Sequence, residues 1–414
     1  MDNLTHSLVG LALAESIFQR SPTAKLQNRA AVRAAYWAVS IGASNLPDAD
    51  ILLSGLMAPA KLGYLLHHRG HSHTILVALL LGAGLLGVLA WLHRRSFPGT
   101  TWDKRAIAAL CVAGPALHLL LDYFNSYGVH PFWPFANHWV YGDAVFIVEP
   151  LILFALLPVL FFATNRRGIK WACEFAFFGL LAAAWTVPLT KWYSAIGITL
   201  FGLVAAVVAK LLSGRRRADV ALAVVALIYA GFALLGSHVR ARLVADQAQF
   251  HESATLRDLV LSPLPANPFC WSVLTVETLA GGARYRVRRG VYAPFARWID
   301  ATQCPTRYAR STASLREVAD LWGPEYFWEG QYQASIKDFK IFQAYSCAWN
   351  AYLRFARVPF LSEEAGDFKA GDLRFDFEPG EGFSEVTLPP DEAFCRTYVP
   401  PWDPPRADIF KDGE

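Results

Sequence analysis

The sequence predicts a mainly α-helical fold, with a polytopic helical membrane domain followed by an extracytoplasmic α+β domain. Of 414 residues, 54% are hydrophobic and 17% are charged, whereas about a quarter of the residues of soluble domains are charged. The charge balance also changes along the chain. Residues 1–237 hold 18 Lys and Arg against 10 Asp and Glu, and residues 238–414 hold 20 against 24. We therefore expect a basic membrane domain over 1–237 and a mildly acidic, soluble, β-rich domain over 238–414.

About seven to eight apolar segments are candidates for membrane spans, since about 20 residues cross a hydrocarbon core. The first segment is short, and the second has a polar centre. A cleaved signal peptide is disfavoured because no Lys or Arg precedes the first segment. In chain order the segments are Leu4–Phe18, Ala34–Leu56, Thr74–Leu92, Ala106–Phe124, Val145–Ala163, Trp171–Leu189, Ser194–Leu212 and Val220–Gly236.

Loop charge predicts the orientation. The connections on one side of the predicted spans hold 15 basic residues, and those on the other side hold only Lys61, Arg69 and Lys191. The positive-inside rule makes the first side cytoplasmic. We expect a multi-pass protein of the bacterial inner (cytoplasmic) membrane, with residues 238–414 on the extracytoplasmic side. No compact basic motif accompanies the charge, so nucleic acid is not an expected partner.

The region after residue 238 has the pattern of a soluble domain. Two β-rich runs flank a Gly281-Gly282 turn, which predicts a hairpin. Val239–Leu259 is expected to be a helix at the membrane surface. The predicted strands are Phe269–Thr278, Arg284–Tyr292, Ala370–Glu378 and Phe383–Leu388.

Cysteine usage agrees with export of this region. Four of the six cysteines lie there, and an even number in an oxidising compartment predicts up to two disulfides, in any of three pairings. The other two fall within predicted spans and are expected to act as small apolar residues. The four are Cys270, Cys304, Cys347 and Cys395.

Three short polar runs interrupt the apolar segments: Asn45–Asp50, His67–His73 and His118–Asp122. Ionisable side chains at membrane depth are costly, so they indicate a functional site. Histidine nitrogens and aspartate oxygens are the usual ligands of hydrolytic metals. Eight of the eleven histidines fall near the predicted outer face. The runs therefore predict a metal site in the membrane domain.

Each run contributes candidate ligands. His118 and Asp122 are four residues apart, so a helix presents both on one face. Asp48 and Asp50 follow Pro47, which breaks the helix and allows both carboxylates to turn inward. The spacing does not decide which of the histidines from His67 to His71 ligates. The predicted metal ligands are His6, Asp48, Asp50, His68, His73, His118 and Asp122.

Three residues are candidates for catalysis. The planar guanidinium of Arg69 suits a phosphate. Asp50 or Glu149 would accept a proton from the attacking water. Seven candidate ligands exceed what one tetrahedral zinc ion needs, so we expect divalent metal, zinc above all, with two or more ions.

The motifs carry a resemblance to a known family. Thr5-His6, Leu46-Pro-Asp-Ala-Asp50, His68-Arg-Gly-x-Ser-His73 and His118-x-x-x-Asp122 with Gly128 resemble the membrane-bound metal-dependent hydrolases of the YdjM type, over roughly residues 1–150. That family is similar to zinc-dependent phospholipase C and P1 nuclease. The resemblance implies a helical zinc phosphoesterase, and it supports the seven ligands. Glu149 stands where the pattern has aspartate before proline.

A site at the outer membrane face favours a lipid or lipid-linked phosphate as substrate. Three alternatives remain. In a structural or binding protein the metal would only hold helices together, and the sequence does not separate this case because the ligands are the same. A metal or ion transporter needs polar groups towards the cytoplasmic face, which the later segments nearly lack. An intramembrane protease would carry His-Glu-x-x-His or a paired Gly-Asp signature, and neither occurs.

Overall fold

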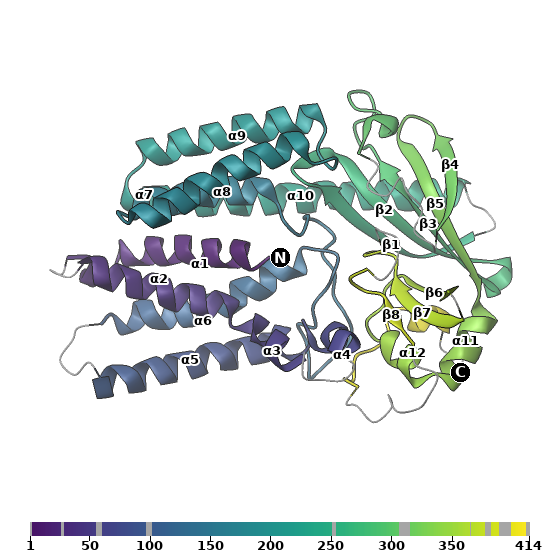
Figure 1. The fold of residues 1–414 in the computed structure, drawn as a ribbon, viewed down its shortest axis with the longest axis horizontal. Coiled ribbons are helices and arrows are strands. Elements are labelled where there is room, and N and C mark those ends of the chain that lie inside the picture. The colour runs from purple at the N-terminus through teal and green to yellow at the C-terminus, as the bar shows by residue number, and fades with distance from the viewer. Residues whose placement is uncertain are drawn as a thin grey trace.

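The computed structural model describes residues 2–25, 29–54, 60–96, 102–250, 254–305, 315–364, 366–376, 382–388 and 399–410. The molecule is elongated, with a helical region at one end and two β-sheets at the other (Figure 1). The predicted fold class is confirmed, because a mainly helical N-terminal region precedes a C-terminal α+β region with two antiparallel sheets.

The helices of the N-terminal region run mostly along the long axis of the molecule (Figure 1). Helix α1 packs against α2, α7 and α10, and α6 packs against both α2 and α5. Two short 3-10 turns, η2 (Pro47–Ala49) and η3 (His71–His73), lie between helices. The helices are α1 (Asn3–Phe18), α2 (Arg29–Asn45), α3 (Asp50–Ser54), α4 (Ala60–His67), α5 (Ile75–Ser96), α6 (Lys104–Tyr123), α7 (Pro150–Ala163), α8 (Arg167–Thr186), α9 (Trp192–Leu211) and α10 (Gly214–Phe250).

Within the described residues, five helices are long and apolar enough to cross a membrane. They are α5, α6, α8, α9 and, in α10, residues Gly214–Asp246. Helix α7 is apolar but has 14 residues, and α1 and α2 have 16 and 17. The protein is therefore a membrane protein whose shorter helices pack among five candidate spans.

Two predicted segments differ from the helices. The predicted segment Ala34–Leu56 is not one helix, because α2 ends at Asn45 and Pro47 starts the 3-10 turn η2. Its residues 55–56 lie outside the described residues. In the segment Val145–Ala163 the helix begins only at Pro150, because Glu149 caps it.

The C-terminal region contains a five-stranded sheet in the order β1-β2-β3-β5-β4 and a three-stranded sheet in the order β6-β7-β8, and neighbouring strands are antiparallel in both. The elements are β1 (Ala254–Leu264), β2 (Asn267–Leu279), β3 (Arg284–Tyr292), β4 (Arg316–Trp322), β5 (Tyr326–Ser335), α11 (Ile336–Tyr345), α12 (Cys347–Tyr352), β6 (Pro359–Glu364), β7 (Asp367–Asp372), β8 (Val386–Thr387) and α13 (Ala407–Phe410).

The predicted hairpin is confirmed, since β2 pairs with β3 and Gly281 between them has a positive φ of 64°. The predicted helix Val239–Leu259 is wrong at its end. Helix α10 stops at Phe250, and β1 begins at Ala254, where pairing with β2 overrides the helical pattern. Residues 251–253 lie outside the described residues.

The two later strand predictions are confirmed only in part. The predicted strand Ala370–Glu378 overlaps β7, which ends at Asp372, and residues 377–378 lie outside the described residues. The predicted strand Phe383–Leu388 is reduced to the two residues of β8.

Disulfide bonds occur in the C-terminal region, as predicted. Cys270 is bonded to Cys304, and Cys347 is disulfide-bonded as well. Cys395 lies outside the described residues. Cys111 and Cys173 are free and buried in the helical region. Among the described cysteines, the disulfides are thus confined to the region predicted to be exported.

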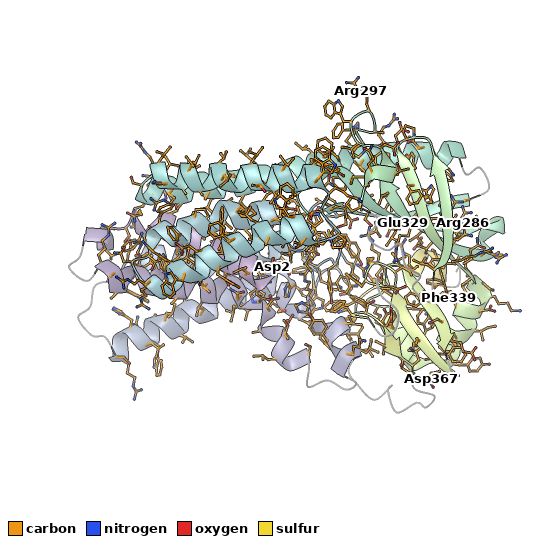
Figure 2. The ribbon with its side chains drawn as sticks, turned by 45° about the horizontal axis from the view of Figure 1, so that its top comes forward. Asp2, Arg286, Arg297, Glu329, Phe339 and Asp367 are labelled. Carbon is orange, nitrogen blue, oxygen red and sulfur yellow. A yellow bond between two sulfur atoms is a disulfide. The ribbon has the colours of Figure 1, made fainter. Side chains whose placement is uncertain are left out.

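The two regions share their cores. Trp271 and Trp328 of the large sheet lie in one hydrophobic cluster with Phe232 of α10 and Leu8 of α1. Figure 2 shows side chains filling the space between helices and sheets, with Asp2, which caps α1, near this junction. The start of α1 and the polar runs therefore lie where the sheets meet the helical region.

A buried ion cluster also joins the two regions. Arg357 donates from Nη1 to Asp143 Oδ1 at 2.8 Å and from Nε to Asp258 Oδ2 at 2.7 Å. Its guanidinium also lies 4.0 Å from the ring centroid of Tyr141. Because breaking such a buried pair leaves an uncompensated charge, this cluster fixes the C-terminal region against the helices.

Candidate metal centre

Four side chains direct one ligand atom each into the same small volume. The ligand atoms of Asp48, His73, His118 and Asp122 lie within 4.8 Å of one another. Nε2 of His73 lies 3.0 Å from Nε2 of His118 and 3.3 Å from both Asp48 Oδ1 and Asp122 Oδ2. Nε2 of His118 lies 3.3 Å and 3.5 Å from the same two oxygens. The chain thus brings two nitrogens and two oxygens together.

These distances fit a small divalent cation. Zinc binds histidine nitrogen and carboxylate oxygen at about 2.0–2.1 Å, so neighbouring ligand atoms of a tetrahedron lie about 3.3–3.4 Å apart. The five measured distances run from 3.0 to 3.5 Å. These five distances therefore match those expected between the ligand atoms of a tetrahedral site.

The outer nitrogens of both histidines are held by other groups. Nδ1 of His118 lies 2.6 Å from the carbonyl oxygen of Ser44. A carbonyl only accepts, so Nδ1 donates and Nε2 carries a lone pair. Nδ1 of His73 lies 2.9 Å from Oγ of Ser72, which itself donates to Asp50. Nδ1 of His73 then donates too. An outer acceptor that fixes the tautomer is typical of metal-ligating histidines.

The arrangement attracts positive charge. Burial alone would lower the pKa of His73, but hydrogen bonds with Asp122, Asp48 and Asp50 raise it to about 10. Burial would raise the pKa values of Asp48 and Asp50, yet their hydrogen bonds to the histidines hold both well below the usual range. The histidine lone pairs and the carboxylate oxygens face each other and repel, so a proton or a metal ion between them is needed.

A second group lies beside the first and shares Asp48. It consists of Asp48, Asp50 and His68. Nδ1 of His68 lies 3.0 Å from Asp50 Oδ1, and Asp50 Oδ2 accepts from the backbone N of Arg69 at 3.1 Å. The other oxygen of Asp48 accepts from Asn3 at 2.8 Å. Two adjacent ions with Asp48 between them are compatible with this geometry.

Local sequence explains how the ligands reach the site. Pro47 opens the turn η2, which places Asp48 and Asp50 beside η3. His118 and Asp122 lie one turn apart on the buried face of α6. Gly114 allows α6 to approach α2 closely, because a Cβ there would lie 2.6 Å from that of Ala43. His118 and Asp122 therefore follow a close contact between α6 and α2.

Arg69 joins the cluster to its surroundings. Its φ of 58° is uncommon for a residue other than glycine, and such strain tends to occur at functional sites. Nε lies 3.0 Å from Asp122 Oδ2, and Nη1 donates to Asn125 Oδ1 at 3.0 Å. The guanidinium also lies 4.7 Å from the ring centroid of Tyr127. The predicted phosphate-binding arginine is thus in the site, and it also holds a ligand.

The remaining predicted residues lie differently. Nε2 of His6 is 3.2 Å from Asp122 Oδ1, and its ring stacks on His118 at 3.8 Å, so His6 is beside the four converging atoms. Glu149 is not brought to the cluster. Its two carboxylate oxygens accept from the backbone N of Leu151 and Ala266, since a residue before Pro150 caps the helix. Burial raises the pKa of Glu149 to about 7.

Sequence reasoning missed several supporting groups. The carbonyl of Ser44 acts through the backbone, so its residue type gives no signal. Asn3 and Tyr127 are not metal ligands by type, and nothing in their spacing marks them. Ser72 could have been found, because it stands between two histidines of the polar run.

A cavity of about 370 Å³ opens beside the cluster, and its size is typical of ligand sites. The helical region and the C-terminal region both line it. Its polar side includes Asp48, His68 and Arg69, and its apolar side includes Ile51 and Phe383. The other lining residues are Asn3, Tyr64, Asn125, Ser126, Tyr127, Val145, Phe146, Ile147, Ser262, Arg374 and Phe375.

Comparison with known proteins agrees with the motifs. Residues 1–193 match the YdjM inner membrane protein family. All four residues of the cluster lie within this YdjM region, as do Asp50 and His68. Together with the five candidate spans, the match identifies a membrane protein with a buried His/Asp cluster that could hold a metal ion.

The chain is also similar to the uncharacterized protein YfhP of Bacillus subtilis (strain 168). The two are 25% identical over 173 residues, which cover 41% of this chain and 49% of YfhP. The chain thus spans about half the length of that relative. No solved structure matches the chain.

Proposed function

We propose that this protein is a membrane-embedded, metal-dependent hydrolase that cleaves a phosphoric ester of a lipid or a lipid-linked group. The observation that carries the proposal is the convergence of His73, His118, Asp48 and Asp122 at tetrahedral distances. A cavity lined by Asp48 and Arg69 adjoins this convergence. The donor set and the adjacent space together suit hydrolysis.

The residues fit one or two divalent ions, zinc above all. Asp48, His73, His118 and Asp122 would hold the first, and Asp48, Asp50 and His68 the second. When bound, such ions supply Lewis-acid activation of a water molecule and of the phosphoryl group.

Side chains of the protein would bind the phosphate group and accept the proton of the attacking water. Arg69 lines the cavity and presents a planar guanidinium, which binds phosphate oxygens and offsets the negative charge of the reacting group. Asp50 is held ionised by hydrogen bonds from Ser72 and the Arg69 amide. When no second ion takes it as a ligand, it is the proton acceptor that we favour. Glu149 is not part of the proposed site because both of its carboxylate oxygens accept hydrogen bonds from backbone N–H groups.

Apolar exposure favours a lipid substrate. Ile51 and Ile147 line the cavity and remain 37% and 42% exposed, and the neighbouring Leu52 is 77% exposed. Exposed apolar side chains that adjoin a cavity are typical of sites that take a ligand from a membrane or an apolar partner. A phosphate at the cluster with its lipid chain along these residues fits this arrangement.

We place the site and the C-terminal region on the extracytoplasmic side of the bacterial inner membrane. The helix ends that flank the basic connections lie remote from the sheets (Figure 1); they are the end of α1 and the start of α2, the end of α5 and the start of α6, the end of α7 and the start of α8, and the end of α9 and the start of α10. The positive-inside rule assigns that end to the cytoplasm. Disulfides in the C-terminal region support the same orientation.

One observation favours the alternative of a structural metal site. The side chains of His73, His118 and Asp122 are at most 1% exposed, as expected when an ion only holds helices together. Asp48, His68 and Arg69 line the cavity instead, which favours an accessible site. A measurement of hydrolytic activity distinguishes the structural site from the catalytic site.

The test is elemental analysis of detergent-purified protein together with hydrolysis of phospholipid vesicles. We expect bound zinc or a similar metal, and release of a phosphate-bearing product, in the wild type. Both should be lost in His118→Ala/Asp122→Ala and kept in His93→Ala, whose residue lies in the last turn of α5. Bound metal without hydrolysis of any phosphoester would favour the structural alternative. Absence of metal would exclude both.

A further inference from the structure

The polar run His67–His73 packs against a tryptophan from the C-terminal region. Trp402 is fully buried, and its Nε1 donates to the carbonyl oxygen of Leu66 at 2.9 Å. The indole also lies 4.7 Å from the ring centroid of His71. Residue 402 is outside the part of the chain that matches the YdjM family. A residue that the family match does not include therefore touches the segment that carries His68 and His73.

The contact includes the backbone of the run. A Cβ on Gly70 would lie 3.0 Å from Cζ2 of Trp402 and 2.8 Å from the carbonyl oxygen of His67. Only glycine allows the backbone to lie this close to the indole. The indole plane thus sets the path of the residues between His68 and His73.

His130 extends the contact to Arg69. It is fully buried, its ring stacks on Trp402 at 3.8 Å, and it also lies 3.8 Å from the ring of Trp139. Its Nδ1 lies 3.2 Å from the carbonyl oxygen of Arg69, which can only accept. His130 therefore donates to the backbone of Arg69.

The backbone of Arg69 is then held from both sides. Asp50 accepts its N–H at 3.1 Å, and His130 donates to its carbonyl. Between these bonds the residue keeps its left-handed φ of 58°, a conformation that is unfavourable for a non-glycine residue. The conformation directs the side chain to Asp122.

We propose that Trp402 is a positioning residue of the metal site. Acting through His130 and Gly70, it holds the run His67–His73 so that Arg69 reaches Asp122 and His73 meets His118. The inference rests on the proposed metal site and adds that the C-terminal region completes it.

A matched control is available in the same core. Trp349 is also fully buried and lies in the same hydrophobic cluster, but its ring contacts are with Phe339, Phe342 and Tyr352. Replacing it removes a similar buried area without touching the run. A purely structural role of Trp402 would make the two replacements equivalent.

The test is a cobalt titration of the full-length protein in detergent, followed by visible absorption, which reports the coordination geometry of Co²⁺. Trp402→Ala should weaken Co²⁺ binding roughly 10-fold or more, as loss of outer support does at metal sites, and should change the band shape. Trp402→Phe keeps a ring against His130, so it should restore most of the affinity. Trp349→Ala should bind Co²⁺ like the wild type, although thermal unfolding shows that it is destabilised.

Two results would overturn the inference, and they distinguish failure of the role of Trp402 from failure of the proposed metal site. Wild-type Co²⁺ affinity and spectrum in Trp402→Ala would refute the positioning role and leave the metal site intact. Absence of Co²⁺ binding in the wild type would refute the proposed metal site together with the role of Trp402.

Discussion

The packing of α6 on α2 gives a sharp test of the proposed metal site. At Gly114, a Cβ would lie 2.6 Å from Cβ of Ala43 and 2.9 Å from the backbone N of Ser44. Ordinary van der Waals contact begins at 3.4 Å, so Gly114→Ala requires the two helices to separate by about 0.8 Å.

The separation acts on a metal ligand one turn away. Nδ1 of His118 lies 2.6 Å from the carbonyl oxygen of Ser44. Moving α6 by about 0.8 Å stretches this distance to about 3.4 Å, beyond the usual range of an N–H···O bond. We expect a 10–100-fold loss of zinc affinity, together with about 1–3 kcal/mol of destabilisation from overpacking.

The assay is competition for zinc between a chromophoric chelator and the detergent-solubilised protein. Gly84→Ala is the matched control, because a Cβ at Gly84 of α5 meets nothing within 4 Å. It should leave zinc affinity unchanged and stabilise the helix slightly. A Gly114→Ala variant that binds zinc as tightly as the wild type would refute the link from helix packing to His118.

Three further outcomes are expected. Arg357→Met removes the guanidinium that Asp143 and Asp258 share and leaves Asp143 paired with Arg240 alone, so chemical denaturation should show a loss of about 3 kcal/mol; an unchanged midpoint would contradict this. Burial raises the pKa of Glu149 from 4.5 to about 7, so its stabilising contribution is complete below about pH 4.5 and is lost as the pH rises through 7. The melting temperature should fall between pH 5 and 7 and level off above, and Glu149→Gln should flatten this profile. Cys270→Ser/Cys304→Ser opens a loop with a sequence separation of 34, and thermal unfolding should report a loss of about 4 kcal/mol.

The helix-borne part of the site could be predicted because local rules determine it. His118 and Asp122 are four residues apart, so they share a face of α6 wherever this helix packs in the fold. Proline lacks an amide hydrogen and disfavours continuation of a helix, so a turn that presents Asp48 and Asp50 could be predicted at Pro47. The predicted span across Pro47 was wrong for the same reason.

Other parts of the site depend on contacts between distant residues. Leu66 and Trp402 are 336 positions apart, and no local pattern marks the tryptophan as a neighbour of the polar run. Glu149 was predicted to be a proton acceptor, but the proline that follows it makes it the cap of α7. Strand β1 was predicted as helix because its pairing with β2 is a tertiary effect.

The contact with Trp402 also bears on how the protein matures. Residue 402 leaves the ribosome after every helix of the bundle, and yet it packs against a loop that is synthesised before α5. During membrane insertion the residues of the His/Asp cluster are therefore present before Trp402 can pack against the run His67–His73. With the role proposed for Trp402, the site becomes ordered only once the C-terminal region has folded, so metal is captured at the last stage of biogenesis, from the compartment in which that folding takes place.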